Sequence, residues 1–233
     1  ASYRLHYGAV GGLELTNEGI VGGEFIELVP SRDGLSDLLQ AKFPALARFN
    51  VYQVAEADRA LIPEVLRGQI AVSATTAQGE LLDATGVQIP GALDDLYNYT
   101  GALGVTWDAG APTLRVWAPT AQAVRLHVFD DAMITESTVL DMGWDAATGV
   151  WGISGDASWN YKYYLYEVVV YAPSTRQIET NLVTDPYSFS LSTNSQRSQI
   201  VDLNDPALMP DGWNDTVKPA LDAFEDIVLY ELH

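Results

Sequence analysis

Short runs of alternating apolar and polar residues recur along the chain, separated by Gly, Asp, Asn and Pro. The runs are rich in Val, Tyr, Thr and Trp, and a period of two is typical of β-strands that bury one face. Near the N-terminus, the runs at 23–29 and 69–75 each lead into a turn-forming segment. The pattern therefore predicts a mainly β protein.

One segment has helical rather than strand spacing. Between Leu35 and Phe49, apolar residues recur three or four positions apart, and Pro44 interrupts the series. Because proline has no N–H to donate and its ring clashes with the preceding turn, we expect the helix to bend or restart there. We expect this short helix to cover a small sheet.

The alternation stops near Ile89, where Pro90 and Gly91 precede a polar stretch that reaches Gly104. Proline and glycine pairs mark turns and loops, so this stretch resembles a boundary between folded regions. The pattern predicts a small N-terminal β domain with a short helix over residues 1–90 and a linker over residues 91–104.

A second series of strands is expected at 113–117, 123–129, 150–153 and 163–171, and its regularity predicts an immunoglobulin-like β-sandwich over residues 105–190. Within 123–129 the apolar residues occupy alternate positions, which places His127 on the face turned to solvent. The polar chain after Tyr171 predicts an extended connector over residues 191–233, in which residues 225–233 have the pattern of a strand.

Charge restricts the partners. The chain has 31 Asp and Glu against 12 Lys and Arg, a net charge of −19, no Cys, and 48% apolar residues. Such a charge repels phosphate backbones and anionic lipid headgroups, so we expect no nucleic-acid partner and no membrane partner. Without cysteine there are no disulfides and no thiolate sites, whereas the apolar content predicts a folded chain.

Motifs for metal, nucleotide or nucleophile chemistry are missing from the sequence. The three histidines lie far apart, no Gly-x-Ser-x-Gly motif is present, and the pairs Gly11-Gly12 and Gly22-Gly23 match no phosphate-binding pattern. We expect these glycines to shape hairpin turns. The sequence predicts no metal site, no cofactor and no catalytic residue in this segment.

Aromatic residues are abundant in this chain and could bind a ligand. Sugar rings have apolar faces that stack on Trp and Tyr, which makes Trp144, Trp159 and Tyr171 candidate carbohydrate-binding residues. Core packing is the alternative interpretation. It is the simpler one for Trp117 and Trp151, which lie inside predicted strands.

Several stretches taken together resemble one family. They are TLRVWAPTA at 113–121, YYLYEV at 163–168, NLVTDPYS at 181–188 and NSQRS at 194–198. With EDIVLYELH at 225–233, which resembles the first barrel strand of that family, the chain is similar to the N-terminal region of type I pullulanases and limit dextrinases, glycoside hydrolases of family 13. The resemblance implies a small N-terminal domain followed by a starch-binding-like sandwich of carbohydrate-binding module family 48.

The resemblance implies a parent enzyme that hydrolyses α-1,6 branch linkages in pullulan, starch and limit dextrins. Its (β/α)8 barrel needs about 250 residues, so this segment is expected to lack the catalytic machinery and to be inactive alone. Its own catalytic barrel and an α-glucan are the implied partners. Asp185, Pro186 and Tyr187 are implied to belong to the connector that docks on the barrel.

Sugar binding by the sandwich is left open. Glycogen-binding relatives place a Trp shortly after the Phe of the third strand, whereas Ala132 follows Phe129 here. This difference favours a docking role, and a free-standing α-glucan-binding module remains the alternative. An immunoglobulin-like adhesion module would explain the strands but not the linked motifs. The acidic composition favours a secreted, periplasmic or cell-surface location in a bacterium.

Overall fold

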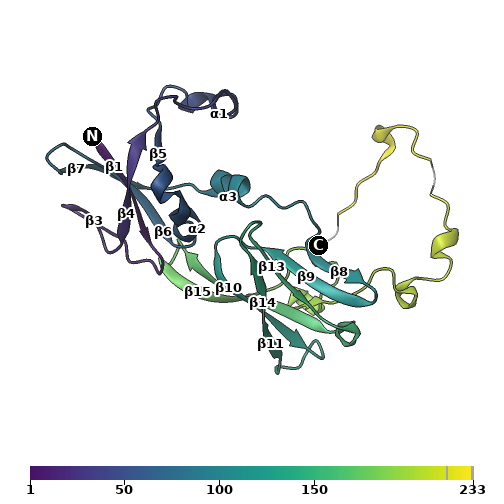
Figure 1. Ribbon diagram of the computed structural model, residues 1–233. Helices are drawn as coiled ribbons and strands as arrows, with labels where there is room; N and C mark the ends of the chain where they lie inside the picture. Colours follow the sequence, from purple (N-terminus) through teal and green to yellow (C-terminus); the bar gives the residue numbers. More distant parts are fainter. Residues whose placement is uncertain (219, 232–233) are drawn as a thin grey trace. The chain divides into compact units, whose positions relative to one another are not determined.

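The computed structural model describes residues 1–218 and 220–231 (Figure 1). Contacts within the chain divide it into two compact units, Ala1–Val201 and Asp202–His233. All strands formed by the described residues lie in the first unit, and they build two separate β regions. The prediction of a mainly β protein is therefore confirmed.

The N-terminal sheet has five antiparallel strands in the order β5-β4-β1-β6-β7. They are β1 (Ser2–Gly8), β4 (Glu24–Pro30), β5 (Tyr52–Val54), β6 (Gln69–Thr75) and β7 (Leu81–Gly86). Leu5 on β1 pairs with Ile26 and Val72, and helix α2 (Ile62–Val65) adds Val65 to the same apolar cluster. The strands predicted at 23–29 and 69–75 are confirmed.

Glycines shape the turn region around a hairpin of β2 (Glu14–Thr16) and β3 (Gly19–Val21). Gly12 and Gly22 have φ angles of 88° and 91°, in the region that favours glycine. A Cβ atom on Gly22 would collide with the carbonyl oxygen of Gly12. The glycine pairs therefore serve a turn, as the sequence predicts.

The predicted helical segment contains α1 (Asp37–Lys42) and a 3₁₀ turn, Pro44–Leu46, so the break at Pro44 is confirmed. The side chain of Ser36 caps α1 by accepting a hydrogen bond from the Leu39 N–H at 3.4 Å. The expectation that this helix covers the sheet is wrong. Neither helix buries a residue, and Leu38 is 78% exposed. Helical spacing predicts an apolar stripe along a helix, but it does not predict whether another element packs against that stripe.

The predicted linker is partly helical, because α3 (Pro90–Leu96) begins it. Proline suits the first turn of a helix, where its missing N–H would have no partner. Tyr97 follows α3 and is only 3% exposed, and its carbonyl oxygen accepts a hydrogen bond from Trp117 Nε1 at 2.9 Å. Tyr97 therefore ties the end of α3 to the sandwich, while most of the residues around it stay exposed.

The sandwich has one sheet in the order β11-β10-β14-β15, with β16 beside β14, and a second in the order β12-β13-β9-β8. The strands are β8 (Gly104–Asp108), β9 (Ala111–Trp117), β10 (Ala121–Phe129), β11 (Thr138–Asp141), β12 (Gly143–Asp145), β13 (Val150–Ser154), β14 (Tyr163–Ala172), β15 (Gln177–Val183) and β16 (Ser198–Gln199). Leu114, Leu126 and Tyr166 lie in its core with no exposed surface. The predicted sandwich is confirmed.

The predicted alternation of β10 is correct for its apolar residues, because Val124, Leu126 and Val128 are buried. The placement of His127 in solvent is wrong. Its side chain is 14% exposed, and its ring nitrogens lie 2.9 Å from Glu167 Oε2 and 3.0 Å from Ser137 Oγ. A polar side chain on the outer face can be covered when neighbouring strands supply polar partners.

The chain after Tyr171 is not a free connector at first. Strand β15 pairs along β14, and β16 pairs with the start of β14. Ile200 has no exposed surface, and the first compact unit extends to Val201. Residues 191–201 of the predicted connector thus lie in the same compact unit as the sandwich, because polar residues of this stretch find partners there.

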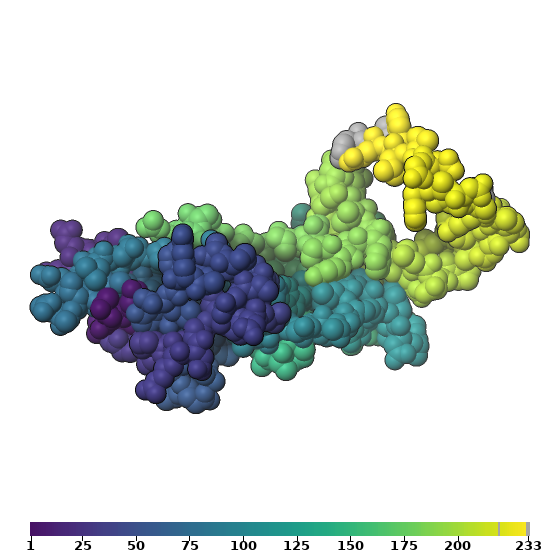
Figure 2. All heavy atoms as spheres, turned by 90° about the horizontal axis from the view of Figure 1, so that it is seen from above, coloured from purple at the N-terminus to yellow at the C-terminus, as the bar shows by residue number. Residues whose placement is uncertain are grey.

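The second unit, taken by itself, contains three short 3₁₀ turns, Pro206–Leu208, Trp213–Asp215 and Phe224–Asp226. In the space-filling view its yellow residues form a thin arc (Figure 2). The strand predicted at 225–233 is not formed over the described residues 225–231, because no other described strand pairs with it. Residues 232 and 233 of that prediction lie outside the described residues.

Candidate functional site

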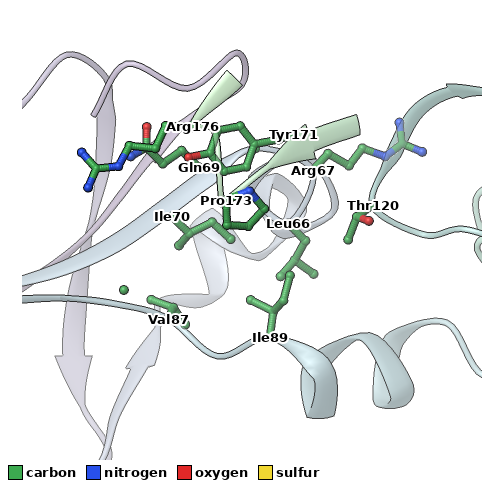
Figure 3. Close-up of a pocket in the computed structure, with 12 residues that line it drawn as sticks. Leu66, Arg67, Gln69, Ile70, Val87, Ile89, Thr120, Tyr171, Pro173 and Arg176 are labelled. Atoms are coloured by element: carbon green, nitrogen blue, oxygen red, sulfur yellow. The ribbon is translucent and has the colours of Figure 1, made fainter. Parts of the chain in front are cut away.

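A cavity of about 380 Å³ lies where the N-terminal sheet meets the sandwich (Figure 3). Its lining residues are Leu66, Arg67, Gly68, Gln69, Ile70, Gly86, Val87, Ile89, Thr120, Tyr171, Pro173 and Arg176. Figure 3 shows the guanidinium groups of Arg67 and Arg176 at opposite ends, with apolar side chains between them. Tyr171 is the one predicted carbohydrate-binding residue in this lining.

Polar residues that line this cavity are already engaged in contacts within the protein. Gln69 accepts a hydrogen bond from the Leu13 N–H at 2.8 Å and donates to the Leu13 carbonyl at 3.2 Å, which ties the β2-β3 hairpin to β6. Burial raises the pKa of Tyr171, so its phenol stays neutral. A Cβ on Gly11 would lie 3.1 Å from the ring of Tyr171, which places this ring in tight packing. The cavity is thus mainly a domain joint.

Two side chains hold this joint together. Gln122, on β10, donates from Nε2 to the carbonyl oxygen of Ala9 at 2.7 Å and to that of Arg67 at 3.2 Å. The guanidinium of Arg67 lies over the Trp144 ring, 4.3 Å from its centroid, in a cation–π contact. The N-terminal region and the sandwich therefore share direct polar and aromatic contacts, and both belong to the first compact unit.

Trp144 and Trp159 are both partly buried against the sandwich core. The Trp144 ring lies 5.0 Å from the ring of Trp151 and 6.1 Å from that of Tyr97, with Arg67 over one face. Trp159 lies in the 3₁₀ turn Ala157–Trp159, against Gly155. These two residues and Tyr171 come from three separate elements and do not form one platform. Their role in sugar binding stays a prediction.

A second set of aromatic residues lines a cavity that the sequence pattern does not predict. A cavity of about 360 Å³ is lined by Asp94, Tyr97, Asn98, Tyr99, Leu103, Trp117 and Tyr187. Tyr97 and Tyr99 lie in the predicted linker, and Trp117 was assigned to the core. The available signal in the sequence was the pair of tyrosines on either side of Asn98, a few residues after Pro90, which favours a helix start.

Asp185 anchors the start of the predicted docking connector inside the sandwich. It is 4% exposed, and its Oδ2 accepts hydrogen bonds from Tyr164 Oη at 2.7 Å and Tyr166 Oη at 3.2 Å. Burial raises the pKa of Asp185, against the opposing effect of its hydrogen bonds, the first of them from the Tyr187 N–H. Burial also raises the pKa of Tyr164 and Tyr166. Pro186 and Tyr187 remain exposed, and their docking on a barrel stays a prediction.

Charged residues form one further cluster, on the outer face of the β10-β14 pair. Glu167 is bonded to Arg125 and to His127. Burial acts to raise the pKa of Glu167, but the hydrogen bonds from His127 and Arg125 outweigh it and hold this pKa below its usual value. The cluster neutralises a covered carboxylate.

Within residues 1–218 and 220–231, no group of three or more His, Cys, Asp or Glu side chains could hold a metal ion. His6 Nε2 lies 2.8 Å from Ser73 Oγ, but both residues are buried within the N-terminal sheet. A substrate does not reach this pair. Within the same residues, no helix has the length and apolar character that crossing a membrane requires.

Comparisons with known proteins agree with this architecture. The sequence matches the pullulanase N2 domain over residues 1–95 and carbohydrate-binding module 48, the isoamylase N-terminal domain, over residues 102–188. The chloroplastic pullulanase 1 of Arabidopsis thaliana is 36% identical over 226 residues, which are 95% of this chain and 23% of the relative. A pullulanase of Klebsiella pneumoniae is 37% identical over 220 residues, 93% of this chain and 20% of the relative.

A crystal structure of Klebsiella pneumoniae pullulanase complexed with maltotriose superposes with a TM-score of 0.84 at 34% identity, over 93% of this chain and 20% of that one. The chain thus spans about a fifth of the length of the relatives that it matches. It is homologous to the N-terminal region of pullulanases, with a pullulanase N2 domain matched over residues 1–95 and a carbohydrate-binding module of family 48 matched over residues 102–188.

Proposed function

We propose that this chain is the non-catalytic N-terminal part of a pullulanase-type enzyme, which hydrolyses α-1,6-glucosidic branch linkages in pullulan, starch and limit dextrins. The observation that carries the proposal is the match of both domains, in order, to pullulanases at 36% and 37% identity over nearly the whole chain. More than three-quarters of each of these relatives lies outside the matched segment, which leaves room in them for the catalytic barrel.

The proposed role of the two domains is to support and dock that barrel. Gln122 and the Arg67–Trp144 contact join the domains, so they can act as one support. Asp185 holds the start of the connector in the sandwich, while Tyr187 beside it is 38% exposed. A fixed start for the connector would limit the positions open to the next domain, which lowers the entropic cost of docking.

The second part of the proposed role is to assist α-glucan binding. The sandwich belongs to a carbohydrate-binding module family, and one homologous pullulanase was crystallised with maltotriose. A neutral oligosaccharide is compatible with a protein of net charge −19, which repels anionic ligands. Aromatic side chains in the sandwich supply surfaces on which sugar rings stack.

Pullulan hydrolysis tests the proposal. The product of the complete gene should release reducing ends from pullulan, whereas the 233-residue chain should release none above a boiled control. A maltotriose end product from the complete protein would identify cleavage at α-1,6 linkages. Activity of the 233-residue chain would refute its non-catalytic role, and an inactive complete protein that is folded would refute the pullulanase assignment.

A further inference from the structure

We propose that the aromatic-lined cavity beside the end of α3, bounded by Tyr97, Tyr99, Trp117 and Tyr187, is an α-glucan subsite of this chain; the proposal rests on the α-glucan binding proposed above. Its wall comes from three parts of the chain that are distant in sequence: the segment after α3, the end of β9 and the segment after β15. None of the residues predicted from sequence to bind sugar lines it.

The walls of the subsite are fixed before any ligand arrives. Trp117 Nε1 donates to the carbonyl oxygen of Tyr97 at 2.9 Å, and the Tyr97 N–H donates to the Leu93 carbonyl at 2.9 Å, so the indole is tied to the end of α3. Gly104, with φ of 77°, brings its backbone so close to Tyr187 that an added Cβ would lie 2.9 Å from the tyrosine Cβ. Preformed walls reduce the ordering cost of binding.

Free polar groups lie on the rim of this cavity. Asp94 and Asn98 are exposed, and within the described residues neither side chain forms a hydrogen bond or an ion pair. A carboxylate accepts from hydroxyl groups, and an amide both donates and accepts. Aromatic walls with a carboxylate and an amide at the edge combine the apolar faces and hydroxyl edges that a sugar ring requires.

Two further hollows share aromatic residues with this cavity. Tyr99 is shared with a hollow of about 230 Å³, Tyr97 is shared with one of about 220 Å³, and Trp144 lines both of these. The second hollow is next to unpartnered buried groups, since Tyr97 Oη and the Nε and Nη2 atoms of Arg67 have no hydrogen-bond partner within the described residues. Hollows with shared aromatic walls fit an oligosaccharide better than a single small molecule.

The ligand class follows from charge and size. The net charge of −19, with Asp94 on the rim, disfavours phosphates and other anions. Small-molecule pockets commonly measure about 300–1,000 Å³, and 360 Å³ is near the lower limit. We therefore expect a short stretch of neutral α-glucan, with ring faces against Tyr99 and Trp117, rather than a large branched dextrin enclosed on all sides.

Titration of the 233-residue chain with maltotriose and maltohexaose, by calorimetry and by tryptophan fluorescence, tests the subsite. We expect Tyr99→Ala to weaken binding about tenfold or more, because one ring contact is removed. Tyr99→Phe keeps the ring and should retain the affinity. Asp94→Ala should weaken binding, whereas Asp95→Ala, the matched control on the same helix but outside the lining, should not.

Each alternative result has a distinct meaning. If maltohexaose binds equally to the wild type, Tyr99→Ala and Asp94→Ala, the subsite is refuted and α-glucan binding elsewhere on the chain stands. If cellohexaose binds as well as maltohexaose, the α-glucan class is refuted. If the chain, folded by circular dichroism, binds no α-glucan at millimolar concentration, the subsite and the glucan-binding role are both refuted. Pullulan hydrolysis by the complete protein still decides the enzymatic assignment in every case.

Discussion

The sandwich and the N-terminal sheet are built from similar strands, but they bury very different amounts of apolar surface. The sandwich closes two sheets over a cluster of twelve buried residues, whereas the N-terminal sheet gathers three around Leu5, Ile26 and Val65. Burial of apolar surface is the main favourable term in folding. The sandwich is therefore expected to be stable by itself, and the N-terminal domain to depend on its neighbour.

Side chains from both domains form the contacts that join them. Gln122 reaches from the sandwich to two backbone carbonyls of the N-terminal domain, and Arg67 reaches from the N-terminal domain to Trp144 of the sandwich. A small domain with one covered sheet face gains more from such contacts than a closed sandwich does. We therefore expect the contacts at the joint to stabilise the N-terminal domain more than the sandwich.

The largest expected effect is in the sandwich core. Leu126→Ala should lower the free energy of unfolding by about 3–5 kcal/mol, since Leu126 has no exposed surface and a cavity would remain. All six tryptophans lie at or after residue 107, so urea denaturation followed by tryptophan fluorescence reports on the sandwich and the unit after it. Ile26→Ala, the matched change in the N-terminal sheet, should leave that fluorescence transition nearly unchanged. A large shift in Ile26→Ala would contradict the independence of the sandwich.

Asp185 gives the next largest effect. Asp185→Ala should cost about 1–3 kcal/mol, because the buried hydroxyls of Tyr164 and Tyr166 lose their acceptor. The same urea titration measures this change. An equal cost for Asp141→Ala, an exposed aspartate of the same sheet, would show that the tyrosine contacts are not the cause.

The pKa of Asp185 also predicts a pH dependence. Burial raises this pKa above its unfolded value of about 3.9, so the folded state holds the proton to higher pH. Stability from this group is therefore greatest below the unfolded pKa and declines as the pH rises through the folded pKa. Denaturation of wild type and Asp185→Asn between pH 3 and pH 7 checks this. The difference between the two proteins should change with pH in that window, and a constant difference would rule the effect out.

Gln122→Ala should have a smaller effect, about 1 kcal/mol, because two hydrogen bonds of ordinary net strength are lost. We expect it to accelerate amide hydrogen exchange in β1 and β6 more than in β10 and β14, since the N-terminal domain is the dependent partner. Gln78→Ala, at the exposed β6-β7 turn, is the control. Faster exchange confined to the sandwich would contradict this prediction, because it would mean that the sandwich depends on the N-terminal domain.

The smallest effect is expected at α1. Leu38→Gln should change stability by about 0.5 kcal/mol or less, because the side chain is 78% exposed and joins neither buried cluster. Thermal denaturation followed by circular dichroism measures it. A loss comparable with that of Ile26→Ala would mean that α1 packs on the sheet after all.

Strand positions could be predicted because they depend on local patterns. Val124, Leu126 and Val128 alternate with polar residues, and the strand that they form buries them as the period of two requires. The break of the helix at Pro44 follows from the covalent structure of proline. Such features need only neighbours in sequence.

Errors arose where partners come from distant segments. His127 is covered by Glu167 and Ser137, forty and ten residues away. Ser198, which belongs to a polar stretch, is buried because it bonds to the Asp185 N–H and pairs with β14. The strand pattern at 225–231 has no pairing strand among the described residues. A polar residue was therefore correctly predicted to be exposed only where no polar partner from a distant segment covers it.

The sequence by itself determined the mainly β composition of this protein, the positions of its principal strands, the family resemblance and the absence of cysteine chemistry. Only the tertiary structure decided which aromatic residues share a cavity, since Tyr99, Trp117 and Tyr187 come together from three separate segments. It also decided that the N-terminal domain contacts the sandwich through Gln122 and Arg67. The reason is physical: strand formation depends on patterns of adjacent residues, whereas cavities and joints depend on which surfaces meet after the chain has folded.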